Sequence, residues 1–299
     1  WWQEPEGTVS AGLKFVRALG PKFREDPRAL YSTGLPPDQT GHGGHRNFPF
    51  KDGPRSVGWS NGYVQGQVDS QGGFVHVNMG GPLRYLKPDG EIITIAGWRV
   101  KPDRDPVWIL KSLNSIRQNM ELRGTWVNGQ DAADPGFHSP MDVTYDRKDE
   151  SIWYVAGYGD HVIWKVQVDK TTWTGTVSVF AGDPGRSKGY ADGVGTAARF
   201  NRPSSLVFDP VSDAIYVADQ DNDAVRKITR SGTVTTLFGR PGAGARLKAA
   251  GVPDTFVEEG MVESANQPLN RGASVFEVTA AQASAGTHPD IYMPMAIRV

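Results

Sequence analysis

Short runs in which apolar and polar residues alternate recur along the chain and end at glycine. An alternation of period two is typical of a β-strand with one buried face. Runs at 92–97, 177–182 and 234–239 end in this way. Two further alternating runs precede each of them, at 74–78 and 83–87, at 152–156 and 162–166, and at 214–218 and 224–228. The pattern predicts three groups of adjacent antiparallel strands.

Each group also has a leader strand. Proline opens the segments 140–143, 203–206 and 294–297, shortly after an aromatic residue. Proline suits the first residue of a strand because no ladder donor is needed there. A segment near 63–68 supplies the leader strand of the first group. Four antiparallel strands recurring at roughly 40–50 residues are the signature of a propeller blade. The predicted fold class is therefore an all-β propeller.

The linker before the third group has a more specific pattern. It runs Ala181-Gly182-Asp183 and then from Gly189 to Pro203, with strands 215–219 and 224–228 after it. These residues resemble the NHL-repeat β-propellers. The resemblance is close over 181–239, good over 137–182 and fair over 68–97. It implies a ring of six blades and places His161 in the same structural slot as Asp223. His76, aligned with Tyr154 and Tyr216, is interpreted as a packing residue.

The chain divides into an N-terminal extension, 1–52, and blades over 53–299 with inserts at 99–136 and 240–290. The first insert predicts an amphipathic helix, capped by Asp105 and ended by Gly124. Its apolar positions are Ile109, Leu113, Ile116 and Met120. A helix lying on the propeller rim is favoured over one that docks another subunit. A shorter helix is predicted at 9–19.

The visible repeats are too few for a ring. Three near-complete blades are followed by the beginning of another at 294–299. An open propeller exposes sheet edges and blade faces to water. We expect the remaining blades on another polypeptide of the same precursor, or on a segment outside this sequence. The chain begins at Trp1, which a cleaved signal peptide or a processed precursor explains, and the expected location is extracellular or periplasmic.

Composition excludes several classes of function. Lys and Arg number 32 against 33 Asp and Glu, so a nucleic-acid binder that relies on bulk charge is disfavoured. The longest apolar run is far shorter than the ~18 residues of a membrane span. The absence of cysteine excludes thiol nucleophiles, thiolate metal sites and disulfides within this chain.

Two groups of residues are weak metal candidates. His42 and His45 lie in a glycine-rich segment near Asp38, and zinc is the metal that such a pair suits. Asp219, Asp221 and Asp223 alternate as in a calcium loop, although the glycine and distal glutamate of an EF-hand are absent. A solvated loop and ordinary turn chemistry are favoured over zinc and calcium, so no cofactor is predicted.

The chain lacks the residues that several enzyme classes require. Peptidyl-hydroxyglycine amidating lyases, which resemble NHL propellers, place a zinc-binding histidine directly after the leader proline, where this chain has Met141, Ser204 and Met295. Nucleophile-elbow and phosphate-loop motifs are also missing. The sequence favours a non-catalytic scaffold that binds a protein partner. The alternative is a secreted or periplasmic enzyme with its active site in the central channel, so enzymatic activity stays open.

Overall fold

Three four-stranded antiparallel sheets make up most of the described chain. The computed structural model describes residues 52–54, 64–78, 81–103, 120–127, 136–239 and 241–242. The first blade contains β1 (Val64–Val68), β2 (Phe74–Asn78), β3 (Leu83–Leu86) and β4 (Ile92–Val100). The second contains β7 (Pro140–Tyr145), β8 (Ile152–Gly157), β9 (Val162–Asp169) and β10 (Thr174–Ala181). The third contains β12 (Pro203–Asp209), β13 (Ala214–Asp219), β14 (Ala224–Thr229) and β15 (Thr233–Gly239).

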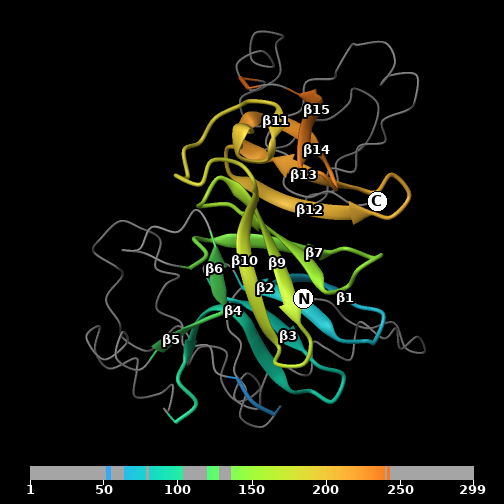
Figure 1. The fold of residues 1–299 in the computed structure, drawn as a ribbon. Coiled ribbons are helices and arrows are strands. Elements are labelled where there is room, and N and C mark those ends of the chain that lie inside the picture. Colours follow the sequence, from blue (N-terminus) through green and yellow to red (C-terminus); the bar gives the residue numbers. More distant parts are fainter. Residues whose placement is uncertain are drawn as a thin grey trace, which may run out of the picture.

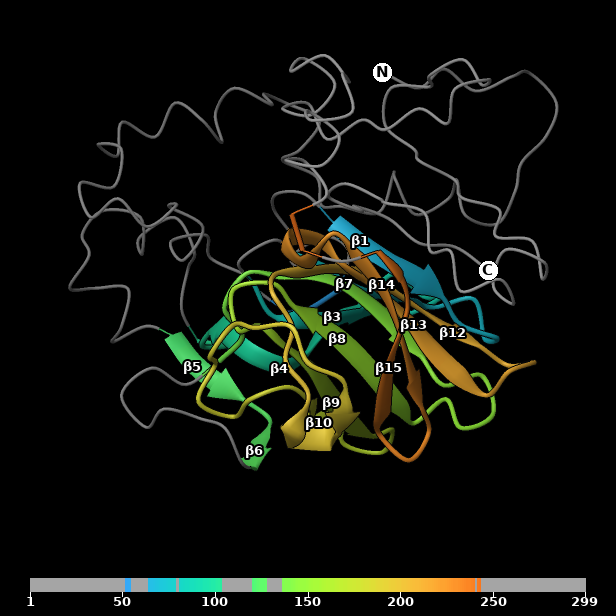
Figure 2. The same cartoon turned by 90° about the horizontal axis from the view of Figure 1, so that it is seen from above.

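The blades follow one another as a fan, as Figure 1 shows in teal, green to yellow, and orange. Their first strands, β1, β7 and β12, lie next to one another. The sheets formed by the described residues are separate and do not close into a ring, and Figure 2 shows the fan from above. These are β-propeller blades, which confirms the predicted fold class.

Each sheet gains a fifth short strand. β5 (Met120–Arg123) pairs antiparallel with β4, and β6 (Thr125–Val127) pairs parallel with β10. β11 (Gly193–Val194) pairs with β15 and leads into the 3₁₀ turn η3 (Gly195–Ala197). A second 3₁₀ turn, η4 (Gln220–Asn222), joins β13 to β14. No helix among the described residues has the length and apolar character needed to cross a membrane.

An aspartate closes the turn after each first strand. Asp69, Asp146 and Asp209 each accept a hydrogen bond from the backbone N–H two residues later, at 3.0, 2.8 and 2.9 Å. Such Asx turns let the chain reverse within a few residues. At the other end of a blade, Gly182 has a φ of 108°, and a Cβ there would lie 3.0 Å from the carbonyl oxygen of His161. Glycine fits this closing position because it has no Cβ.

The core lies between the blades. One apolar cluster joins the first and second blades and includes Tyr85, Trp153 and Trp164. Another joins the second and third blades and includes Tyr154 and Phe208. The second blade therefore has an apolar residue set on each face, Trp153 and Val155 on one and Tyr154 and Ala156 on the other, as a sheet covered on both sides requires.

Polar side chains connect the first strands. The Thr144 hydroxyl donates to Oε1 of Gln67 at 3.1 Å and accepts from the backbone N–H of Phe208 at 3.1 Å. Oδ2 of Asp142 accepts from the Ser205 hydroxyl at 2.7 Å and from the N–H of Leu206 at 3.2 Å. These bonds cross from the first blade to the second and from the second to the third.

Several sequence predictions need correction or lie outside the described residues. Met120 is not the last apolar position of a helix but the first residue of β5, so the insert 99–136 contributes two strands to the sheets. The rest of the predicted helix, the helix at 9–19, the insert at 240–290 beyond Gly242 and the leader at 294–297 fall outside the described residues.

The structure confirms the predicted position of His161 and corrects the alignment of His76. His161 and Asp223 occupy equivalent turns, with φ values of 57° and 51°. His76 was aligned one residue out of register: Val75, opposite Tyr85, is the residue equivalent to Tyr154 and Tyr216. His76 is buried and stacks on Phe74 with the ring centroids 5.3 Å apart, so its interpretation as a packing residue holds.

Candidate functional site

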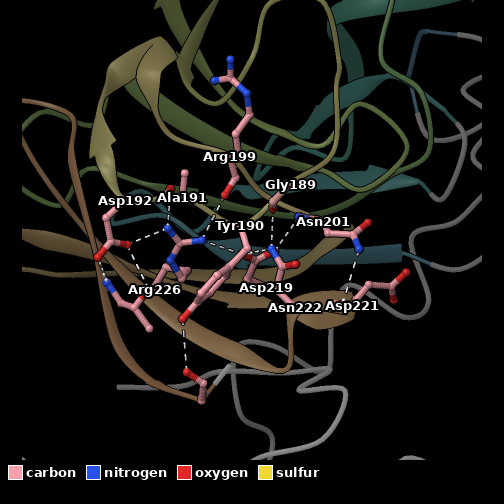
Figure 3. Close-up of polar contacts among 12 residues, drawn as sticks. Gly189, Tyr190, Ala191, Asp192, Arg199, Asn201, Asp219, Asp221, Asn222 and Arg226 are labelled. Carbon is pink, nitrogen blue, oxygen red and sulfur yellow. Dashed lines mark hydrogen bonds and ion pairs between the residues drawn. The ribbon is translucent and has the colours of Figure 1, made fainter. Parts of the chain in front are cut away.

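A buried arginine fastens the linker between the second and third blades, as Figure 3 shows. Arg226 lies on β14 and its side chain is fully buried. Nη1 donates to the carbonyl oxygen of Arg199 at 3.0 Å and to Oδ2 of Asp219 at 2.8 Å. Nη2 donates to the carbonyl oxygen of Ala191 and to Oδ1 of Asp192, both at 2.7 Å. One guanidinium therefore ties both ends of segment 191–199 to the third blade.

Asp192 extends this arrangement to β15. Its Oδ1 accepts from the Thr236 hydroxyl at 2.9 Å, and its Oδ2 accepts from the Thr236 backbone N–H at 3.1 Å. The rings of Tyr190 and Phe200 lie on the Arg226 guanidinium, each with its centroid 5.2 Å away, which is cation–π distance. We call Asp192, Asp219, Arg226 and Thr236 the linker lock.

Asp219 is the buried anion of the lock. Its carboxylate also accepts from the backbone N–H of Asn201 and from the Asn222 amide, both at 2.8 Å. Burial raises the pKa of Asp219 to about 6, while Arg226 and the hydrogen bonds oppose that shift. At neutral pH Asp219 and Arg226 form a charged pair whose side chains have no access to water, so the energy of the pair depends on both partners being present.

The first blade repeats three members of the lock, because Asn78 stands at the position equivalent to Asp219. Thr94 faces Arg84 across two strands just as Thr236 faces Arg226. Nη2 of Arg84 lies 3.2 Å from Oδ1 of Asp52, and the Thr94 hydroxyl donates to the same oxygen at 2.6 Å.

The backbone register shows that the acidic residues are equivalent as well. Gly53 pairs with Ile92 as Gly193 pairs with Val234. Each glycine follows the aspartate of its lock. Asp52-Gly53 is thus the counterpart of the Asp-Gly dipeptide at 192–193.

The second blade replaces the charges with apolar groups. Trp164 occupies the arginine position and faces Val179 where the other blades have threonine. Trp126 of β6 packs edge-on against Trp164, with the ring centroids 5.9 Å apart. An ion pair and an edge-to-face contact of aromatic rings therefore occupy the same position in different blades of one chain.

The lock carboxylates predict acid sensitivity. Burial acts to raise the pKa of Asp52, but Arg84 and hydrogen bonds from Thr94 and Arg99 hold it below its usual 3.8. Burial likewise acts against the hydrogen bonds from Thr236 and Arg226 to Asp192, whose net pKa is also lowered. The unfolded chain binds these protons more readily than the folded one, so stability is complete above about pH 4 and falls below it.

Urea midpoints measured between pH 4 and pH 2 test this expectation. Asp219, whose pKa burial raises to about 6, stays protonated in the folded chain over this range, and in the unfolded chain it takes up its proton around pH 4, so its opposing contribution is confined to the upper end of the range. We expect the midpoint to fall with pH, and to fall less steeply in Asp192→Asn. A midpoint that stays constant down to pH 2 would contradict the role given to these carboxylates.

A second charged group lies at the turn between β8 and β9. Asp160 is buried, and its Oδ2 accepts from the backbone N–H of His138 at 3.0 Å and from Nε1 of Trp164 at 2.9 Å. Its Oδ1 lies 2.9 Å from Nδ1 of His138 and 3.2 Å from Nε of Arg186. Asp160 thereby joins two linkers to the second blade.

An exposed surface lies beside Asp160. Arg202, half of whose side chain is exposed at 53%, has its guanidinium 5.5 Å from the centroid of the Tyr158 ring. Nη1 of Arg202 lies 3.3 Å from Oδ2 of Asp221, and the Arg202 backbone N–H donates to Nδ1 of His161 at 3.1 Å. Burial, then Arg202 and Lys188, lower the pKa of His161, so its ring is neutral and accepts this bond.

We call these residues the loop face: Tyr158, His161, Arg202 and Asp221. The guanidinium and the aromatic ring are held in place by neighbouring turns of two blades. Arginine and tyrosine are the residue types that most often anchor protein interfaces. The arrangement suits recognition of a partner.

The predicted metal residues are not brought together. Among the described residues no three His, Asp or Glu side chains form a group that could hold a metal. Asp219 belongs to the lock, Asp221 pairs with Arg202, and Asp223 ends the η4 turn. His42 and His45 lie outside the described residues. Met141 and Ser204 lie at the predicted leader positions, in β7 and β12.

Sequence reasoning missed the locks, although the chain holds their signal. In both blades the threonine lies ten residues after the arginine, and an Asp-Gly dipeptide lies upstream. Asp52 was assigned to the N-terminal extension, which separated it from Arg84. Aligning Arg84 with Arg226 would have located the lock in both blades.

Several solved structures are similar in fold. An auxiliary nutrient binding protein from Bacteroides ovatus is 18% identical, with a TM-score of 0.41 over 63% of this chain and 39% of its own. One from Bacteroides thetaiotaomicron is 19% identical, with a TM-score of 0.33 over 64% of this chain and 61% of its own. Virginiamycin B lyase from Staphylococcus aureus is 11% identical, with a TM-score of 0.31 over 60% and 57%.

These matches span less than two thirds of each relative's own length. No protein-family model matches the chain, and no curated protein matches its sequence. The comparisons establish neither a family nor an activity for this chain.

Proposed function

We propose that this chain contributes blades to an NHL-type β-propeller that acts as a non-catalytic, protein-binding scaffold. The linker pattern 181–203 and the leader prolines support the NHL assignment. The remaining blades come from another chain or from a further segment of the same precursor. An extracellular or periplasmic location goes with this proposal.

The observation that carries the proposal is that buried carboxylates order the turns and linkers beside the loop face. Asp160 and Asp219 are buried and bind the turns and linkers that hold the exposed groups in place. A surface that is already ordered loses little conformational entropy when it binds. Arg202 and Tyr158 then provide the contacts that a protein partner recognises.

Native mass spectrometry of the particle purified from its source tests the assembly. We expect a mass above the 32.5 kDa of this chain. A stable, monodisperse particle of 32.5 kDa would contradict the scaffold proposal. Stoichiometric metal in that particle would favour the alternative, an enzyme with its active site in the central channel.

The loop face is tested with a double variant, Arg202→Ala with Tyr158→Ala. We expect its affinity for the co-purifying partner to fall at least about tenfold, because both groups are interface anchors. Val211→Ala is the matched control, since Val211 is 91% exposed at the opposite turn, between β12 and β13. Equal affinity of the double variant and the control would show that the partner binds elsewhere.

A further inference from the structure

A histidine acceptor joins the linker to the second blade at the loop face. The backbone N–H of Arg202 donates to Nδ1 of His161 at 3.1 Å, and His161 lies in the turn between β8 and β9. The preceding backbone N–H, that of Asn201, donates to Asp219 of the third blade at 2.8 Å. Two neighbouring amides therefore bond to different blades, directly before β12 begins at Pro203.

The bond to His161 requires a neutral imidazole ring. A ring nitrogen accepts a hydrogen bond only when it carries no proton, and in the imidazolium cation both nitrogens are donors. Protonation of Nδ1 would set one N–H donor against another, the backbone N–H of Arg202, at a separation of 3.1 Å. The bond therefore cannot persist once the ring is protonated.

Burial and four charged groups act on the His161 ring. Burial is the largest cause that lowers the pKa of His161, and Arg202 and Lys188 of the linker lower it further. Asp160 of the same turn and Asp221 of the η4 turn act to raise it. The net pKa lies below the usual 6.5, so the ring is neutral at pH 7 and takes up its proton in acid.

We propose that acid controls the loop face: protonation of His161 breaks its bond to the Arg202 N–H and releases the Arg202 backbone from the second blade. The new charge also repels the Arg202 guanidinium, which already acts on this ring. Both effects loosen the placement of that guanidinium beside the Tyr158 ring, so affinity for a partner falls. This control rests on the proposed binding function of the loop face and adds its regulation.

Amide hydrogen exchange of the isolated chain tests the control. The protection factor of the Arg202 amide should fall at least about tenfold between about pH 7.5 and about pH 4.5, because the bond is lost in the protonated form. The amide of Val217, in the centre of the third blade, should stay protected over this range. Constant protection at Arg202, or equal loss at Val217, would overturn the proposal.

His161→Asn is the matched control. Its amide oxygen accepts a hydrogen bond at every pH, and asparagine tolerates the φ of 57° found at this position. The protection factor of the Arg202 amide in this variant should change less than about twofold over the same range. An equal fall in the variant would assign the effect to another group, such as Asp219, whose pKa burial raises to about 6, and would overturn the role of His161.

Affinity for the co-purifying partner gives an independent measurement. It should fall at least about fivefold on acidification in the unmodified chain, and less than about twofold in His161→Asn. An equal fall in both proteins would overturn the control of binding. The exchange measurement uses the chain alone, so absence of any partner would contradict the proposed function and leave the result at Arg202 intact.

Discussion

Arg226→Met should lower the free energy of unfolding by about 3–5 kcal/mol at pH 7, because it leaves the buried Asp219 carboxylate without its cation. It also removes the donors to two linker carbonyls. Urea unfolding measures the loss. Lys227→Met, on the neighbouring and more exposed position of β14, should change stability by about 0.5 kcal/mol or less. Equal stability of the two variants would contradict the lock.

The double variant Arg226→Met with Asp219→Asn separates charge from geometry. An asparagine retains a side-chain oxygen for the Asn201 N–H but carries no charge. We expect the double variant to be more stable than Arg226→Met alone, since much of the cost of breaking a buried pair comes from the charge left behind. A double variant that is less stable than Arg226→Met would mean that the carboxylate is needed for its hydrogen bonds alone.

Trp164→Ala should cost about 3–5 kcal/mol, because it empties a fully buried site between the first and second blades. The cavity would lie against Trp126 and Phe137, whose rings contact Trp164 edge-on. Thermal or urea unfolding measures this loss.

Trp164→Phe is the informative comparison. It keeps most of the apolar packing and removes the Nε1 donor to Asp160, so we expect a smaller loss of about 1–3 kcal/mol. If the phenylalanine and alanine variants were equally destabilised, the bond to Asp160 would outweigh the packing of the ring.

The strands were predictable because each blade repeats the same local physics. Alternating residues, a proline at the start of β7 and β12, and glycine directly after β10 or as the last residue of β15 are local signals, whereas β4 runs past Gly97 to Val100. The sequence predicted β1 near 63–68, and the structure places it at Val64–Val68. Such signals recur in each blade because the strands of each blade form the same antiparallel sheet with buried apolar residues.

The locks were less predictable because their members lie far apart in sequence. Asp52 contacts Arg84 because the segment that precedes the first blade pairs with β4, the last of its four main strands. Asp192 contacts Arg226 because the segment that precedes the third blade pairs with β15. Nor does the alternation reveal that Trp164 replaces an arginine. β5 was missed for another reason: Met120 fits a helical spacing, but its backbone pairs with β4.

The locks and the loop face depend on the same linkers. The carboxylate of Asp219 holds the N–H of Asn201, and the next residue, Arg202, carries the exposed guanidinium. Loss of the lock should therefore also loosen the surface proposed to bind a partner. The lock therefore determines how the fold positions the loop face.

Amide hydrogen exchange tests that claim most directly. The N–H of Asn201, near the end of the linker, donates to Asp219 at 2.8 Å, and the N–H of Thr236, on β15, donates to Asp192 at 3.1 Å. We predict slow exchange at both amides in the unmodified chain and loss of protection at both in Arg226→Met, with Lys227→Met unchanged. Fast exchange at either amide in the unmodified chain, or protection that survives in Arg226→Met, would contradict the account.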